Sequence, residues 1–304
     1  MPRLPNFIVI GAARSGTNAL YEYLRQHPAV YVASPKEPRF FAFEDAPPAF
    51  GGPKPNDYTA LPTWTRLADY TALFEPSADQ TAVGEASTVY LYYPGDKPAE
   101  RIRFHVPHAK LVAILRQPAD RAYSNFLLAV QSGWEPLHDF AEALAAEPAR
   151  TRANWSYFLR YRQNSAYYEQ LLRFYRRFPR SQIKVFLYED LTTRPLAMLE
   201  ETFRFLEVNP TFRPDVSARR VASRGHRSRA IDEWLRSPPA RSAALAALLP
   251  AGLRRTARAA IRRWNVVRPP PLDPALRREL TDAFRPDVLR LQELIGRDLS
   301  DWLA

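Results

Sequence analysis

Short apolar runs alternate with stretches of helical periodicity over the first two thirds of the chain. The apolar runs lie in residues 7–10, 30–34, 81–87, 110–118 and 183–191. Continuous runs of this kind are typical of strands that are buried on both faces of a parallel sheet. Helical spacing is found in residues 19–28, 121–133, 138–149, 155–178 and 195–206. This alternation predicts an α/β fold built on a doubly wound parallel sheet.

The remaining segments have other patterns. Residues 44–80 read as a long irregular loop with one short helix, and residues 215–272 are rich in Arg, Ala and Pro. Within the latter, residues 253–264 place apolar side chains on one face and arginines around the other. This pattern predicts a surface helix docked by its apolar face, with an anionic membrane as the alternative partner. Two further helices are predicted at 273–284 and 286–296, from capping and proline signals.

The length of 304 residues fits one large α/β domain with a helical appendage. We expect a single domain over residues 1–304, with an α/β core in 1–214. Residues 215–304 are expected to form an Arg-rich loop and a helical C-terminal extension. The sequence indicates no oligomeric state.

Composition narrows the classes of function. The chain has no cysteine, which excludes disulfides, thiolate metal sites and a cysteine nucleophile. The five histidines show no ligand spacing, so no metal site is expected. The net charge of +11 favours an anionic partner, but the arginines are spread along the whole chain and no nucleic-acid motif is present. No apolar run is long enough to cross a bilayer, and the first one leads straight into a glycine turn, so we expect a cytoplasmic protein.

A loop with two glycines connects the first predicted strand to the first predicted helix. It reads GAARSGTN over residues 11–18. Such a loop presents backbone N–H groups and the positive end of a helix to one point, where phosphate or sulfate binds. Gly11 and Gly16 have P-loop spacing, but Thr17 stands where that motif has lysine, and Arg14 supplies a cation inside the loop. The alternative is a tight strand–helix turn without a ligand.

Arg116 and Ser124 form a second candidate anion site. Arg116 follows a predicted buried strand, at the sheet edge where doubly wound folds bind ligands, and Ser124 lies about two helical turns later. An arginine and a hydroxyl aimed at one point make a phosphate site with charge-assisted hydrogen bonds. The alternative is an ion pair between Arg116 and an acid such as Asp120.

The two segments together resemble the sulfotransferase family that uses 3′-phosphoadenosine 5′-phosphosulfate (PAPS). GAARSGTN resembles that family's 5′-phosphosulfate loop, and LRQPADRAYSNF resembles its 3′-phosphate motif, with Phe126 at the closing tyrosine position. The stretches SPKEPRFF, GEASTVYL and YEDLTTRPLAMLEETFRFLEV also fit, and the C-terminal run resembles the tail of bacterial members. The order and spacing of these motifs cover most of the chain and make the resemblance specific.

The resemblance implies that a sulfuryl group moves from PAPS to a hydroxyl or amine, leaving 3′-phosphoadenosine 5′-phosphate (PAP), without a metal. The transferred group and the leaving phosphate are densely charged, so catalysis is expected to rest on positioning and electrostatic stabilisation. The residues implied at the cofactor are Arg14, Ser15, Gly16, Thr17 and Asn18 for the 5′-phosphosulfate, and Arg116 and Ser124 for the 3′-phosphate. Arg14 and Lys36 are expected to stabilise the transferring group; for Lys36 the alternative is a solvated surface position.

A base must take the proton of the acceptor, and two glutamates are candidates. Glu85 ends a predicted strand, as the catalytic glutamate does in the carbohydrate-directed branch that the chain resembles. We therefore expect Glu85 to be the base, with Glu37 in KEPRFF, whose location is like that of the base in the tyrosine-directed branch, as its rival. For both carboxylates the alternative is an ion pair with one of the many arginines.

The acceptor class stays open, because a carbohydrate, a lipid head group, a phenol or another small hydroxyl compound would serve. We expect the loop at 44–80 and the Arg-rich stretch at 236–268 to set it. Two other functions fit parts of the sequence. A P-loop kinase or NTPase lacks its loop lysine here, and a non-enzymatic basic anion-binding protein would need its charge patterned on one face.

Overall fold

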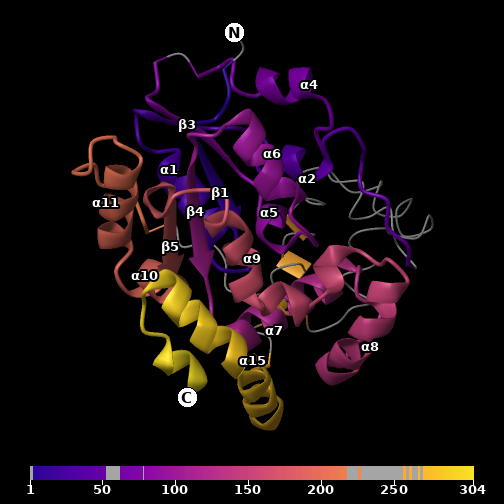
Figure 1. Cartoon of the computed structure of the whole chain (residues 1–304). Helices are drawn as coiled ribbons and strands as arrows, with labels where there is room; N and C mark the ends of the chain where they lie inside the picture. The colour runs from indigo at the N-terminus through magenta and orange to yellow at the C-terminus, as the bar shows by residue number, and fades with distance from the viewer. Residues whose placement is uncertain are drawn as a thin grey trace.

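The structure is a computed structural model that describes residues 3–52, 62–77, 79–217 and 270–304, with short pieces at 225–226, 256–257, 260–261 and 266–267. Its centre is a five-stranded parallel sheet with strand order β2-β3-β1-β4-β5 (Figure 1). The five strands are β1 (Phe7–Gly11), β2 (Val30–Val32), β3 (Ala82–Ala86), β4 (Lys110–Leu115) and β5 (Ile183–Leu187). The predicted α/β class with a parallel sheet is confirmed. A short antiparallel pair, β6 (Gly225–His226) with β7 (Val266–Val267), lies outside this sheet.

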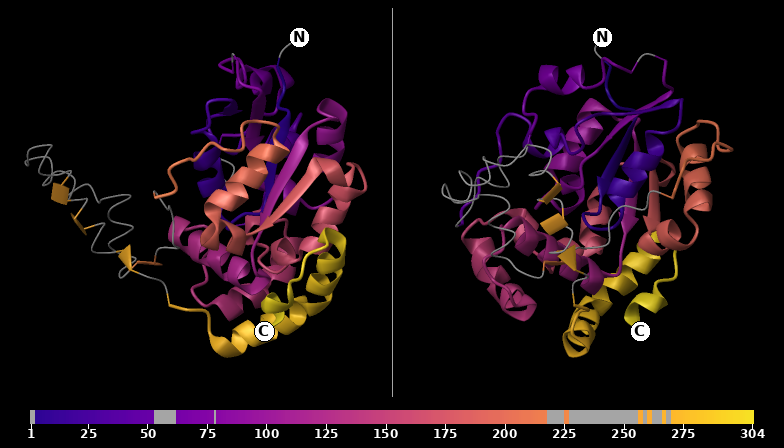
Figure 2. Two further views of the ribbon diagram at one scale, coloured as in Figure 1. Left: turned by 90° about the vertical axis from the view of Figure 1, so that its left-hand side faces the viewer. Right: turned by 180° about the vertical axis from the view of Figure 1, so that it is seen from behind.

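Both faces of the sheet are covered, and the strand sequences show why. In β1, Ile8 and Ile10 belong to the larger core cluster, whereas Phe7 and Val9 belong to the smaller one on the opposite face. Side chains of a strand alternate between the two faces, so a strand covered on both sides is apolar at every position. Helices α1 (Thr17–Leu24) and α11 (Pro195–Phe205) contribute to the smaller cluster (Figure 2).

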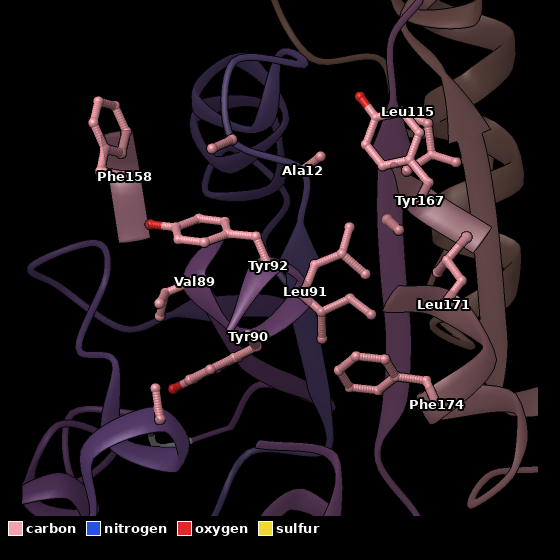
Figure 3. Close-up of a cluster of buried hydrophobic side chains, with 14 of the residues drawn as sticks. Ala12, Val89, Tyr90, Leu91, Tyr92, Leu115, Phe158, Tyr167, Leu171 and Phe174 are labelled. Atoms are coloured by element: carbon pink, nitrogen blue, oxygen red, sulfur yellow. The ribbon is translucent and has the colours of Figure 1, made fainter. Parts of the chain in front are cut away.

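The other face carries most of the described helices and the larger core. This core includes buried residues of α5 and α9 that lie together in Figure 3. The elements that contribute to it are α2 (Phe40–Phe43), α4 (Leu67–Ala72), α5 (Val89–Tyr92), α6 (Lys97–His105), α7 (Pro118–Ser132), α8 (Phe140–Arg152), α9 (Tyr167–Tyr175) and α15 (Pro274–Ile295). The short helix predicted in the loop at 44–80 is therefore present as α4.

The strand order places a ligand crevice at β1 and β4. These two strands are neighbours, but the strand that follows β1 in the chain lies on one side of the pair and the strand that follows β4 lies on the other. In open α/β sheets, ligands bind outside the carboxyl ends of the strands at such a switch point. Both predicted anion sites begin there, the loop after β1 and Arg116 after β4.

The strand predicted over 183–191 is shorter than expected. It ends at Leu187, and helix α10 (Tyr188–Thr193) follows directly. The carboxylate of Asp190 accepts a hydrogen bond from the backbone N–H of Leu187 over 2.9 Å. This contact satisfies a backbone donor at the helix start and turns the chain out of the sheet.

The prediction of one helix over residues 155–178 is wrong in its first half. Two 3₁₀ turns, η1 (Tyr157–Leu159) and η2 (Gln163–Ser165), precede α9. The buried carboxylate of Glu147 accepts the backbone N–H groups of Arg162 and Gln163 over 2.8 and 3.0 Å. These donors are therefore held by a distant side chain, a tertiary contact that local periodicity does not reveal.

The two helices predicted at 273–284 and 286–296 form one helix, α15, which continues through Pro286. Proline removes one backbone hydrogen bond within a helix. Here the buried positions keep their spacing of three or four residues across it, through Leu280, Phe284, Val288 and Leu291. Packing of one continuous face compensates for the lost bond.

Part of the C-terminal region lies outside the described residues. This is the case for the Arg-rich stretch at 236–268, apart from a few short pieces, and for most of the helix predicted at 253–264. The division between a core at 1–214 and an extension at 215–304 stays a prediction. Among the helices that the structure describes, none is long and apolar enough to cross a membrane.

Candidate active site

A cleft of about 930 Å³ lies at the switch point of the sheet, and it collects most of the predicted site residues. Residues from both predicted anion sites and from the loop after β2 line this one cavity. The lining includes Arg14, Gly16, Thr17, Asn18, Lys36, Arg116 and Ser124. Two predicted residues do not line it. Ser15 is completely buried beneath the loop, and Glu85 is completely buried in β3.

The loop after β1 depends on Gly16 to reach the start of α1. Gly16 has φ of 93°, a left-handed conformation that L side chains rarely adopt. A Cβ atom there would also lie 2.3 Å from Leu191 Cδ2, so α10 packs directly against the loop. The first N–H groups of α1, from Thr17 and Asn18, have no carbonyl partner one turn earlier in the helix. A helix start of this kind is suited to an anion, and Arg14 lines the same cleft.

Arg14 connects the two predicted anion sites. Its Nε donates to the hydroxyl of Ser124 over 3.1 Å, and Nη1 of Arg116 donates to the carbonyl oxygen of Arg14 over 3.4 Å. Burial, and then the neighbouring guanidiniums of Arg116 and Arg121, lower the pKa of Arg14 to about 10. The guanidiniums of Arg14 and Arg116, which both line the cleft, repel each other, and a bound dianion would relieve this repulsion.

Arg116 does not pair with Asp120, which was the alternative to its role at a phosphate. The guanidinium of Arg277, on α15, forms two hydrogen bonds with the Asp120 carboxylate instead. The guanidinium of Arg116 lies over the Tyr188 ring, 4.8 Å from its centroid. This stacking orients a planar donor along the cleft wall.

Lys36 links the loop to a carboxylate. Its Nζ donates to Asn18 Oδ1 over 2.7 Å and to Thr17 Oγ1 over 3.4 Å, and it lies 3.3 Å from Glu37 Oε1. Thr88 holds the same carboxylate, through its hydroxyl on Oε1 at 2.9 Å and its N–H on Oε2 at 3.2 Å. A cation and a carboxylate thus lie together beside the loop after β1, and both line the cleft. The ion pair of Glu37 is with Lys36, whereas the alternative expected from the sequence was an ion pair with an arginine.

Glu85 has a different environment from the one its sequence position suggested. It lies two residues after Val83, so its side chain points to the same face of the sheet, into the larger core. Its Oε1 accepts hydrogen bonds from the hydroxyls of Tyr90 and Tyr70, over 2.6 and 3.4 Å. Burial raises the pKa of Glu85 to about 8. Ser87 also hydrogen-bonds to Glu85, so hydroxyl groups surround this carboxylate. Of the two glutamates, Glu37 lines the cleft and Glu85 does not.

The cleft contains features that the sequence reasoning did not assign. Tyr188 and Thr88 belong to stretches that the resemblance included, YEDL and GEAST, but they were given no role. Arg277 comes from the C-terminal helix, and only the tertiary contact with Asp120 brings it to the cleft. In the described residues, no group of three His, Asp or Glu side chains could hold a metal ion.

A family model described as the sulfotransferase family matches residues 5–213. The chain belongs to the sulfotransferase family. The matched region contains the sheet, the loop after β1, Lys36, Glu37, Arg116 and Ser124.

Relatives in this family include enzymes that act on heparan sulfate. The chain is 28% identical over 247 residues to the bifunctional heparan sulfate N-deacetylase/N-sulfotransferase of Drosophila melanogaster, covering 76% of this chain and 22% of the relative. It is 29% identical over 210 residues to heparan sulfate glucosamine 3-O-sulfotransferase 5 of Mus musculus, covering 68% of this chain and 55% of that one. The match thus spans about a fifth of the first relative's length and about half of the second's.

A solved sulfotransferase structure from Alicyclobacillus acidocaldarius matches the whole fold. It is 32% identical, covers 99% of this chain and 100% of its own, and has a TM-score of 0.77. This match shows that the parallel sheet and its flanking helices have the sulfotransferase fold.

Proposed function

We propose that this protein transfers a sulfuryl group from PAPS to a hydroxyl or amine acceptor. The observation that carries the proposal is the convergence of Arg14, Arg116 and Ser124 at one end of a cleft whose loop supplies the N–H groups of a helix start. A donor with two separate anionic groups, a phosphosulfate and a 3′-phosphate, matches two anion sites that share Arg14. Family membership supports the same reaction.

The 5′-phosphosulfate would lie at Gly16, Thr17 and Asn18, with Arg14 beside it. The 3′-phosphate would accept hydrogen bonds from Arg116 and Ser124. Arg116 is held in place by Tyr188, and Arg14 by Ser124, so neither guanidinium needs to reorganise strongly when the donor binds. Arginine at position 14 can bind an oxyanion through two parallel N–H groups, a geometry that a lysine ammonium lacks.

The transfer forms a bond between the acceptor oxygen or nitrogen and sulfur, and it breaks the bond between sulfur and the 5′-phosphate oxygen, which leaves as PAP. Lys36, beside Thr17 and Asn18, would stabilise the charge on the transferring group. We propose Glu37 as the base that takes the acceptor proton. Glu37 lines the cleft beside Lys36, whereas Glu85 is completely buried and held by two tyrosines. This ranking is the reverse of the one that the sequence suggested.

The experiment is transfer of radioactive sulfate from PAPS to a mixed set of hydroxyl and amine acceptors, with a chelator present. Labelled product in the presence of chelator supports the proposal. The charges of the phosphosulfate and the 3′-phosphate of PAPS are then balanced by arginine and lysine rather than by a metal ion. Phosphoryl transfer from ATP that requires Mg²⁺, with no sulfate transfer, would overturn it and favour the kinase alternative. The cytoplasmic location and the likeness to bacterial members remain predictions.

A further inference from the structure

We infer that the acceptor is a small hydroxyl compound with an apolar body, and that this body packs against Leu128 and Phe158 at the end of the cleft away from the arginines. The inference rests on the proposed sulfuryl transfer and names its acceptor class. Among acceptors that carry a hydroxyl group, we expect phenols and alkyl alcohols rather than sulfated or carboxylated sugars.

Helix α7 carries the cleft wall from a charged region to an apolar one. Asp120 and Ser124 lie on the turns nearest Arg14 and Arg277, and Leu128 follows Ser124 one turn later on the same face. Leu127 lies beside it, and both leucines are only partly buried although they line the cavity. The wall therefore offers apolar surface to a ligand just beyond the predicted phosphate contacts.

Phe158 brings this apolar wall to the side of the proposed base. Its carbonyl oxygen accepts the side-chain amide of buried Asn125 over 2.8 Å, which fixes η1 on α7. The preceding Tyr157 packs edge-on against Tyr93, at the end of α5, with ring centroids 5.4 Å apart. Figure 3 shows Phe158 on the side of Val89 and Tyr92 of α5. Helix α5 starts directly after Thr88, the residue that holds Glu37.

The distribution of charge argues against a polyanionic acceptor. Of the described residues that line the cleft, the charged ones are Arg14, Lys36, Glu37, Arg116, Asp120 and Arg277. Arg14, Arg116 and Lys36 contact the loop after β1 or α10 at the donor end, and Glu37 pairs with Lys36. Asp120 and Arg277 pair with each other, so their charges are balanced within the wall. The described wall formed by Leu127, Leu128 and Phe158 is uncharged. Burial of an apolar group against this wall is favourable. A sulfate or carboxylate of a sugar chain would lose its hydration there without a charged partner in the wall.

The size of the cleft leaves space for such a ligand beside the donor. Single small-molecule sites typically have about 300–1,000 Å³, and this cleft of about 930 Å³ is at the upper end of that range. A nucleotide at the arginines and a compact second ligand at the leucines fit one continuous cavity of this volume.

The test is calorimetry on the full chain saturated with PAP. It measures the binding of two apolar alcohols, 2-naphthol and 1-decanol. An unsulfated heparosan tetrasaccharide represents the alternative class of acceptor, a carboxylated sugar. We expect one of the two apolar alcohols to bind and the tetrasaccharide to bind more weakly. Leu128→Asn should weaken binding of that alcohol roughly tenfold or more, since it replaces apolar contact surface by an amide. Leu128→Trp fills the same space and should also exclude the alcohol.

Leu196→Asn is the matched control, because Leu196 is a partly exposed leucine on α11, on the other face of the sheet. It should leave alcohol binding unchanged. Unaltered PAP affinity in each variant shows that the donor site is folded. Tighter binding of the tetrasaccharide, absence of alcohol binding, or equal binding to wild type and both Leu128 variants overturns the acceptor class while PAP binding is retained. If the wild-type chain does not bind PAP at all, the proposed function itself is contradicted.

Discussion

Thr88 holds the carboxylate of Glu37 by two hydrogen bonds, from its hydroxyl to Oε1 over 2.9 Å and from its N–H to Oε2 over 3.2 Å. Thr88 follows the end of β3, so the central sheet itself positions a carboxylate that belongs to a different loop. The ammonium of Lys36 lies 3.3 Å from the same carboxylate. These contacts fix the position of the carboxylate beside the cleft, and a base needs such a fixed position.

Glu37→Gln should lower kcat about 10²–10⁴-fold, because a positioned base contributes a factor of this size. Glu85→Gln should change kcat by less than about tenfold, since Glu85 does not line the cleft. Steady-state rates with saturating PAPS measure both, and PAP affinity serves as the control for each variant. If Glu85→Gln gave the larger loss with PAP affinity intact, the base would be Glu85 and our assignment would be reversed.

Arg116→Ala should weaken binding of PAPS by about 2–5 kcal/mol, as for loss of one partner in a buried charge pair. Adenosine 5′-phosphosulfate, which lacks the 3′-phosphate, should bind the variant and the wild type almost equally. Ser124→Ala should show the same selectivity with a smaller loss, because it removes a neutral hydroxyl. Isothermal calorimetry with both nucleotides gives the comparison. Equal weakening for the two nucleotides would remove Arg116 from the 3′-phosphate.

Glu85 should make the free energy of unfolding depend on pH. Burial raises its pKa from 4.5 to about 8 in the folded protein. Between these values the unfolded chain has released the proton and the folded chain keeps it, so this group lowers stability as the pH rises, by at most about 1.4 kcal/mol per pH unit. Glu85→Gln should flatten the dependence between pH 5 and pH 8. Urea unfolding at pH 5, 6, 7 and 8 measures it, and an unchanged slope in the variant would contradict the assigned protonation.

The strands were predictable because burial on both faces leaves a local signature, as in β1 and β4. The loop after β1 and Arg116 were also predictable, since each follows directly from the end of a strand. The choice of Glu37 over Glu85 as the proposed base depends on which face of β3 the side chain of Glu85 occupies. Glu85 shares its face with Val83, a feature that the sequence contains. That core covers this face as far as the end of β3, and so buries Glu85, depends on tertiary packing.

Long-range contacts account for the remaining differences. Glu147 holds the backbone of Arg162 and Gln163 in a turn that resembles a helix in periodicity, and no local pattern announces this contact. The continuous packing face of α15 outweighs the stop signal of Pro286. The place of Arg277 beside Asp120 likewise joins positions 157 residues apart in the sequence.

The central claim is that the cluster of Arg14, Arg116 and Ser124 binds a 3′-phosphorylated adenosine nucleotide without a metal ion. Thermal or chemical unfolding of the full chain with PAP, compared with ATP and Mg²⁺, tests it most directly. PAP at about 100 times its Kd should add about 2.7 kcal/mol to the free energy of unfolding. ATP with Mg²⁺ at the same concentration should add much less, and Arg116→Ala should abolish most of the PAP effect. Stabilisation by ATP with Mg²⁺ but not by PAP would contradict the account.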